Sequence, residues 1–235
     1  MRPSPRYLAL LAALALQLAW RHASGLAAPT PQTLEAPPPL PALRLASLGD
    51  DTAMARFWML RLQTFDDQAG LQLSLRSLNP NHLEAWLQAI LDLDPRSEYP
   101  LFVALRLYGF LPDEAILRRM IGFIHRAYRA DPDHRAIWLA FAAERAVNRL
   151  KDPSTALLFL EDIRSHPRSH PLPFWISGLH LSLLYGNNEL EKGLLLAQEV
   201  SRQDGLNTAE RQAIEAWILK INQKRTPYAP DIEQK

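Results

Sequence analysis

The sequence predicts an all-α fold in which antiparallel helix hairpins are stacked one after another. Three observations indicate this fold. Apolar residues from Leu45 onward recur mostly at spacings of three and four, the chain contains only nine glycines, and strand-like alternation occurs in one short stretch with no second stretch to pair with it. Because the loops between the periodic stretches are short, sequential hairpins are the economical arrangement.

Residues 1–27 are typical of an export signal. A basic start precedes an apolar run of 14 residues, Tyr7 to Trp20. This length fits the roughly 7–15 residues of a signal sequence better than the about 20 residues of a membrane span. Gly25 and Ala27 form a small-x-small pattern that predicts cleavage after Ala27, and the alternative is an uncleaved anchor with Trp20 at the membrane interface. Both interpretations predict a periplasmic location, either free or anchored in the inner membrane and facing the periplasm.

The stretch 28–44, APTPQTLEAPPPLPALR, contains six prolines and has no helical period. This composition favours a solvated polyproline II conformation. We therefore expect a semi-rigid tether between the export signal and the folded body. The alternative interpretation is a ligand for an aromatic groove.

Residues 45–222 predict a helical body of nine helices. The predicted helix over Pro173–Tyr185 carries apolar residues nearly all round, which predicts that it is buried in the middle of the stack. Between the first two helices, residues 70–78 alternate Leu with polar residues and predict an extended connector lying on the helices. The tail 223–235 is polar and is expected to fray. In chain order the apolar stripes are Met54–Phe65, Leu83–Leu91, Leu101–Tyr108, Ile116–Tyr128, Ile137–Leu150, Ala156–Ile163, Pro173–Tyr185, Leu190–Val200 and Ala213–Ile221.

Local signals predict where the helices begin and end. In the stretch LDLDPRSEYPL, Pro95 stops one helix, and Tyr99 begins the next, which Gly109 ends. Asp92 and Asp94 are separated by about 200° around a helix, so we interpret them as part of a joint and not as an acid–base pair. Capping chemistry predicts helix starts at Asn79-Pro80, Pro112-Asp113-Glu114, Asp133 and Asp152-Pro153.

Prolines recur near the helix ends with the period of a known repeat. DLDP, RADP and RSHP end at Pro95, Pro132 and Pro167, so the spacings are 37 and 35 residues. On these prolines and the signature positions between them, the chain resembles a degenerate array of tetratricopeptide repeats, which are helix–turn–helix units of about 34 residues. The resemblance covers 79–170 best. The residues at signature positions are Leu101, Tyr108, Ala127 and Trp138.

The resemblance implies a stacked α-solenoid of about five helix pairs, because one pair alone cannot bury its apolar stripe. It does not imply the carboxylate clamp with which some such repeats bind chaperone tails. That clamp needs Asn and Lys in the first helix, whereas the positions around Trp138 are Ala136, Leu139, Ala140 and Ala143. The chain also resembles exported proteobacterial proteins that combine a Pro-rich leader with an LRLASLGD-type start.

Composition and charge exclude several classes of function. With 48% hydrophobic and 22% charged residues, the chain is globular and not disordered. It has no cysteine, which excludes disulfides, thiolate metal sites, cysteine nucleophiles and a lipoprotein anchor. The first 28 residues carry three arginines and no acid, so the remainder has 23 basic and 25 acidic residues and a net charge of −2. A near-neutral body argues against nucleic-acid binding, which needs a concentrated basic surface.

Two stretches are candidates for metal binding, and both have a simpler interpretation. His166 and His170 have HxxxH spacing, but two prolines bracket them, so the segment is expected to be a loop. Asp131, Asp133 and His134 lack the further oxygen ligands and the glycine of a calcium loop, so we interpret them as helix-capping residues. No nucleotide-binding or hydrolase motif occurs. The sequence therefore predicts no catalytic residue, no cofactor and no metal.

Two further residue sets have an ordinary structural interpretation. The helix over 116–128 carries a basic arc opposite its apolar arc, and such an arc is typical of a solvated face, which could meet acidic partners or anionic lipid. One tryptophan occurs in about every helix pair, and these rings are interpreted as core. The basic residues are Arg118, Arg119, His125, Arg126 and Arg129, and the tryptophans are Trp58, Trp86, Trp138, Trp175 and Trp217.

These observations predict a non-catalytic scaffold that binds a protein or peptide in a concave groove. We expect no nucleic-acid partner, and membrane contact only through the N-terminal segment. One alternative is an envelope hydrolase that uses carboxylates with His166 and His170. A self-associating structural protein is a third hypothesis. A continuous polar and aromatic patch would support binding, whereas a deep pocket with convergent carboxylates would support the enzyme.

Overall fold

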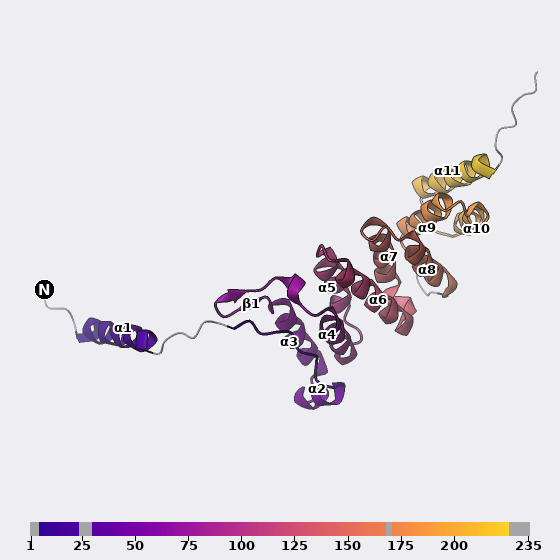
Figure 1. Ribbon diagram of the computed structural model, residues 1–235. Coiled ribbons are helices and arrows are strands. Elements are labelled where there is room, and N and C mark those ends of the chain that lie inside the picture. The colour runs from indigo at the N-terminus through magenta and orange to yellow at the C-terminus, as the bar shows by residue number, and fades with distance from the viewer. Residues whose placement is uncertain (1–4, 24–29, 168–170, 226–235) are drawn as a thin grey trace, which may run out of the picture.

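A computed structural model describes residues 5–23, 30–167 and 171–225 (Figure 1). Within these ranges the protein is all-α, as predicted. Eleven α-helices are accompanied by two 3₁₀ turns and one hairpin with two residues in each strand. The α-helices are α1 (Pro5–Ala23), α2 (Leu40–Ala46), α3 (Asp51–Gln63), α4 (Pro80–Leu93), α5 (Tyr99–Arg106), α6 (Glu114–Ala130), α7 (Pro132–Asn148), α8 (Pro153–Ser165), α9 (Phe174–Gly186), α10 (Leu190–Ser201) and α11 (Thr208–Arg225).

Helices α3 to α11 correspond to the nine helices that the sequence predicts for the body. Their substantial contacts join elements that are one or two places apart in the chain: α4 packs against α3, α5 and α6, α7 packs against α5, α6 and α8, and α9 packs against α8, α10 and α11. Figure 1 shows the same order, with the helices following one another from α3 to α11. The structure is therefore built from local contacts between neighbouring helices.

Three of the predicted helix caps are confirmed. The side chains of Asn79, Asp113 and Asp152 each accept a hydrogen bond, 2.9 to 3.0 Å long, from a backbone N–H two or three residues further on. Each such bond satisfies one of the N–H groups that a helix start leaves without a partner, and it is worth about 1 kcal/mol. Hydrogen bonds to the Asp152 carboxylate, from Ser154 and Thr155 first, also hold the pKa of that group well below its usual range.

The cap of α7 is Asp131 and not Asp133, so that prediction is wrong. The Asp131 carboxylate accepts from the backbone N–H of His134, and Pro132 occupies the first helical position. Proline fits there because its missing N–H would have no partner inside the helix. Pro132 therefore begins a helix, whereas Pro95 follows the C-terminal cap of α4.

Three element boundaries also differ from the prediction. The alternating stretch does find a partner strand: β2 (Leu71–Gln72) pairs antiparallel with β1 (Asp67–Gln68), which immediately precedes it. Gly70 makes the turn with a φ of 77°, a conformation that glycine adopts without strain. A 3₁₀ turn, η1 (Leu75–Ser77), follows. Helix α5 ends at Arg106 and gives way to a second 3₁₀ turn, η2 (Tyr108–Phe110). Helix α11 extends to Arg225, past the predicted end of the body at residue 222.

The Pro-rich stretch packs against the body over much of its length and is not a free tether there. Leu34 is buried, and its carbonyl oxygen accepts from His82 Nδ1 at 2.6 Å. The Glu35 carbonyl accepts from Trp86 Nε1 at 2.8 Å. Residues 40–46 form α2, whose Leu43 is buried, so the folded body begins before residue 45.

The apolar interior forms two clusters that meet in α9. The first extends from Leu34 to Ile176, and the second comprises buried residues of α9, α10 and α11. Helix α9 was predicted to be buried all round, but it buries only four residues, and Trp175 is exposed. Its apolar surface is divided between the two clusters, because Ile176 joins the first and Leu181 joins the second.

The N-terminal helix α1 carries exposed apolar side chains. Among the described residues, none of the helices is both long enough and apolar enough to cross a membrane. The predicted cleavage site after Ala27 and the tail beyond Arg225 lie outside the described residues.

We predict that Leu34 anchors the N-terminal segment. Replacing it with Ala should lower the free energy of unfolding by about 2 kcal/mol, because a buried side chain loses its apolar contacts. Urea denaturation followed by circular dichroism measures this change. The matched control is Leu45→Ala in α2, where the side chain is 79% exposed and the expected change is within about 0.5 kcal/mol. Equal effects of the two substitutions would show that Leu34 is not an anchor.

Candidate functional site

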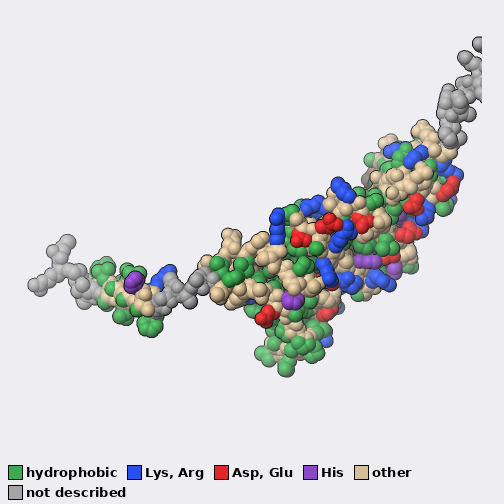
Figure 2. Space-filling view, in the orientation of Figure 1, with side chains coloured by type: hydrophobic (Ala, Val, Ile, Leu, Met, Phe, Trp, Pro, Cys, Tyr) green, Lys and Arg blue, Asp and Glu red, His purple; other side chains and the backbone are tan. Residues whose placement is uncertain are grey.

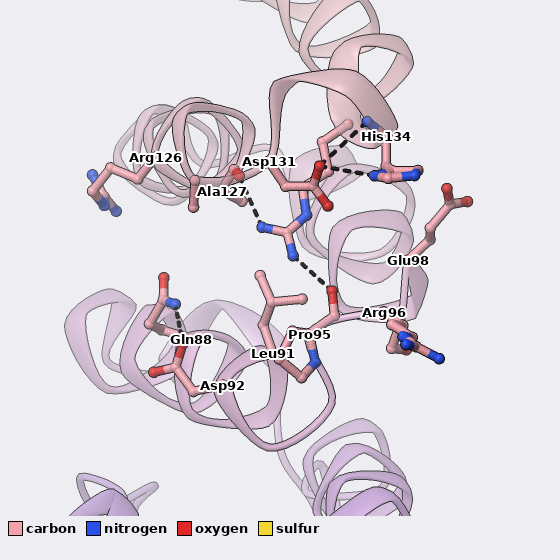
Figure 3. A pocket seen from close by; sticks show the side chains of 13 residues that line it. Gln88, Leu91, Asp92, Pro95, Arg96, Glu98, Arg126, Ala127, Asp131 and His134 are labelled. Atoms are coloured by element: carbon pink, nitrogen blue, oxygen red, sulfur yellow. Dashed lines mark hydrogen bonds and ion pairs between the residues drawn. The ribbon is translucent and has the colours of Figure 1, made fainter. Parts of the chain in front are cut away.

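A cavity of about 800 Å³ lies where the ends of α4 and α6 meet the start of α7 (Figure 3). Its acidic side chains do not converge. The Asp92 carboxylate accepts from Gln88 Nε2 at 2.8 Å, and Asp131 Oδ1 lies 2.9 Å from His134 Nδ1. Figure 3 shows these two pairs on opposite sides of the cavity. Asp94 is the C-terminal cap of α4 and does not line the cavity, so the stretch 91–101 is a joint between helices, as the sequence predicts.

A buried arginine holds this joint together. The side chain of Arg135 donates from Nη1 to the Ala127 carbonyl at 2.8 Å and from Nη2 to the Pro95 carbonyl at 2.7 Å (Figure 3). Ala127 lies in the last turn of α6, and Pro95 follows Asp94, the C-terminal cap of α4, so both acceptors stand near the negative end of a helix dipole. Arg135 is only 7% exposed, and burial of its charge is offset by these two hydrogen bonds.

The basic arc predicted on α6 exists, but most of its charge is neutralised. Arg119 and Arg126 both pair with Glu84 of α4. Arg118 pairs with Glu114 and with the cap residue Asp152. The remaining pair joins His125 to Asp162 at 2.6 Å. Over the central helices, the face shown in Figure 2 mixes Lys and Arg with Asp and Glu in the same way. This arc therefore ties α6 to α4 and α8, and it is a weak candidate for a basic docking surface.

A continuous row of aromatic rings runs across α5, α7 and α9, and we call it the aromatic row. It consists of Tyr99, Phe102, Trp138, Phe141 and Trp175. Successive ring centroids are 6.0, 6.4, 6.0 and 5.2 Å apart. Such distances are those of favourable edge-to-face and stacked pairs. Three of the rings are open to solvent, with exposed fractions of 47% for Tyr99, 44% for Phe102 and 37% for Trp175.

The end of the aromatic row forms a cleft of about 270 Å³ that also contains charged side chains. Arg106 of α5 lies over Phe141, with its Cζ atom 5.6 Å from the ring centroid. Arg145 of α7 lies 4.0 Å from the centroid of Phe110. Burial lowers the pKa of Arg145. The charge of Glu144 opposes this shift, and the charges of Arg106 and Arg149 add to it. Glu144 is the acidic residue in the lining.

The prediction that all five tryptophans belong to the core is wrong for Trp175, which is an exposed member of the aromatic row. Trp86 is buried, whereas Trp58, Trp138 and Trp217 are half-buried and Trp175 is exposed. A second aromatic group stands on α9 and α11, where Lys220 lies 4.8 Å from the Trp217 centroid. The surface position of Tyr99, Phe102 and Arg106 was not predicted. These residues are spaced by three and four and lie outside the buried stripe of α5, and this spacing indicates that they share one exposed face of the helix.

Of the two histidines of the predicted hydrolase alternative, His166 lies in the described part of the chain, where it lines a cavity of about 440 Å³ together with His180, Glu199 and Asp204. His166 Nδ1 bonds the Asp162 carbonyl at 2.8 Å, and His170 lies outside the described residues. In the described part of the chain no group of three or more potential metal ligands occurs. The buried histidine nearby is His180 of α9, whose Nε2 lies 3.7 Å from Glu161. Burial lowers the pKa of His180 to about 4, although Glu161 opposes this shift.

We predict that Arg135→Met lowers the free energy of unfolding by about 2 to 4 kcal/mol. Methionine keeps the apolar stem but leaves the carbonyls of Ala127 and Pro95 without their charged donor. Urea denaturation measures the change. The matched control is Arg96→Met, an exposed arginine of the same cavity, for which the expected change is within about 0.5 kcal/mol. A loss below about 1 kcal/mol at Arg135 would contradict its role at the joint.

We predict that His180 makes the protein less stable in mild acid. Its ordinary pKa is 6.5 and its folded-state pKa is about 4, so between these values the unfolded chain binds more protons. Stability is therefore lost as pH falls, by roughly 2 kcal/mol between pH 7 and pH 5 from this residue. Urea denaturation at the two pH values tests this. In His180→Gln, the difference in unfolding free energy between pH 7 and pH 5 should shrink by that amount, and an unchanged difference would refute the assignment.

No family model matches this chain, and neither a curated protein nor a solved structure matches it. The tetratricopeptide-like interpretation therefore rests on the spacing of the sequence and on the packing of the helices.

Proposed function

We propose that this protein is a non-catalytic helical-repeat scaffold of the bacterial cell envelope that binds a protein or peptide partner. The observation that carries the proposal is the aromatic row, which crosses three helices and exposes three large rings to solvent. A contiguous exposed apolar surface of this kind is typical of a site that a partner covers. Aromatic and arginine side chains are the types enriched at protein interfaces.

The arrangement of helices supports a tetratricopeptide-like solenoid. Contacts between α5 and α7 and between α9 and α11 place odd-numbered helices beside one another, and α4 contacts α6 in the same way. In stacked helix pairs of this kind, one set of helices forms a continuous surface suited to extended partners. The aromatic row lies on the odd-numbered set, and the neutralised basic arc lies on α6 of the even-numbered set.

The proposed location follows from residues 1–27, whose basic start and short apolar run are typical of an export signal. In this proposal, the protein acts in the periplasm, either free or held at the inner membrane by its N-terminal segment. The partner then meets the odd-numbered helices from the periplasmic side.

Site-specific photocrosslinking in intact cells tests the proposed surface. A photoreactive phenylalanine analogue replaces Phe102 in the aromatic row. In a control variant it replaces Leu158, which is 55% exposed on α8. We expect one discrete crosslinked partner from position 102 and none from position 158. Identical products from both positions, or none from position 102, would contradict the proposal.

A further inference from the structure

The molecule already holds one extended peptide against aromatic side chains, and that peptide is its own N-terminal segment. Residues 31–38 line a cleft with Trp58, Trp86, Phe65 and Arg61. The Gln68 amide binds the backbone of Gln32 in both directions, accepting from its N–H at 2.8 Å and donating to its carbonyl at 3.0 Å.

Recognition in this first cleft is mainly of backbone groups plus one apolar anchor. The backbone carbonyls of Leu34 and Glu35 accept hydrogen bonds from the body, and the side chain of Leu34 is buried. Trp58 and Trp86 pack against each other beside the segment, with centroids 4.4 Å apart and ring planes tilted by 35°. Proline-containing segments suit such clefts because their extended conformation loses little entropy on binding.

The cleft at the end of the aromatic row has the same composition but is not covered by any described segment. Trp138, Phe141 and Trp175 supply its rings, and Arg106 and Arg145 supply its positive charge. The successive ring spacings of the whole row make it long enough for roughly five to seven extended residues.

The charge of this second cleft is what identifies its ligand. Among the described residues, the Arg106 side chain has no ion pair or hydrogen bond, and its contact is with the Phe141 ring. Arg145 has one weak ion pair, with Glu144 at 3.7 Å. By contrast, Arg118, Arg119 and Arg126 on α6 are all paired with carboxylates. Arg106 is exposed and has no matching acid, and Arg145 is only partly neutralised by Glu144, so the cleft has an excess of positive charge that attracts a carboxylate from outside.

We propose that this cleft binds an extended, proline-containing peptide that places an acidic side chain beside Arg106 and Arg145 and apolar side chains on the rings of the aromatic row. The inference rests on the proposed function and adds the chemistry of the partner. A single-stranded nucleic acid could also stack on aromatic rings, but it would need a basic groove along its phosphates. A nucleic acid would bring several phosphates to a body whose net charge beyond residue 28 is −2, whereas a single acidic side chain needs only Arg106 and the partly neutralised Arg145.

Calorimetric titration of the full chain with capped ten-residue peptides tests the proposal. The probe is Pro31 to Leu40 of this chain, PQTLEAPPPL, and two further probes replace its glutamate with glutamine or lysine. We expect the acidic probe to bind about tenfold more tightly than the glutamine probe, and the lysine probe to bind more weakly still. Equal affinity for the three probes would overturn the proposal, and so would no detectable binding of the acidic probe.

Paired variants locate the binding. Arg106→Gln with Arg145→Gln should weaken binding of the acidic probe about tenfold or more. Arg119→Gln with Arg126→Gln removes the same charge from α6 and should leave the affinity unchanged within about twofold. If the first pair fails to fold, Trp175→Ala is the second test, because this exposed ring should be dispensable for folding but needed for binding.

The remaining outcomes separate this inference from the proposed function. Binding that is unaffected by the cleft variants would place the peptide elsewhere, such as in the cleft beside residues 31–38, and would overturn the inference alone. A ten-nucleotide thymidine oligomer that binds more tightly than the acidic probe, and loses affinity in Arg106→Gln with Arg145→Gln, would assign the cleft to nucleic acid. A discrete crosslink from position 102 without affinity for the acidic probe would retain the scaffold function and reject this ligand.

Discussion

The two hydrogen bonds of Arg135 fix the joint on which the order of the central helices depends. They connect the end of α4 to the end of α6 through a side chain that begins in α7. In the described part of the chain the substantial helix contacts join near neighbours, the small hairpin pairs adjacent segments, and the sequence has no cysteine for a disulfide, so each joint sets the angle of the helices that follow. A cation is suited to this position because two helix ends direct their carbonyl oxygens to one point. An apolar side chain would remove the charged donor from both oxygens and with it the link between the two helix ends.

Because the joints set the angle between successive helices, they also determine which rings stand side by side. Phe102 of α5 and Trp138 of α7 are 36 residues apart in sequence and are brought to a centroid distance of 6.4 Å by the packing of α5 against α7. Phe141 and Trp175 are related in the same way across α7 and α9. The aromatic row is therefore a property of the packing between helices and of no single helix. Charge is also distributed unevenly, since Arg118 and Arg119 of α6 pair with carboxylates on α4 and at the start of α8, whereas Arg106 of α5 has no such partner among the described residues.

Local physics made most of the fold predictable from the sequence, and long-range packing accounts for most of what was missed. The periodicity of three and four identified α3 to α11, and the capping chemistry of Asn79, Asp113 and Asp152 identified three helix starts. Asp131 and Asp133 are both good caps, and only the backbone conformation decides between them. The packing of Leu34 could not be predicted, because His82 lies 48 residues away and no local pattern connects them. A tryptophan in an apolar stripe looks the same whether other elements cover it, as Trp58 and the N-terminal segment cover Trp86, or leave it open, as for Trp175.

The way in which the Pro-rich stretch packs against the body suggests what kind of ligand suits the uncovered cleft at the end of the aromatic row. The composition that suggested a solvated tether is also the composition of a good extended ligand, since a segment that cannot form a helix leaves its backbone groups free for other partners. In this protein, Gln68, His82 and Trp86 supply those partners, and Leu34 supplies the apolar anchor. The first cleft is satisfied within the chain because its ligand is tethered and its effective concentration is high. The second cleft has rings of the same kind and an excess of positive charge, since Glu144 partly neutralises Arg145 but Arg106 has no acid, and in the proposal an acidic segment from another source supplies what is lacking.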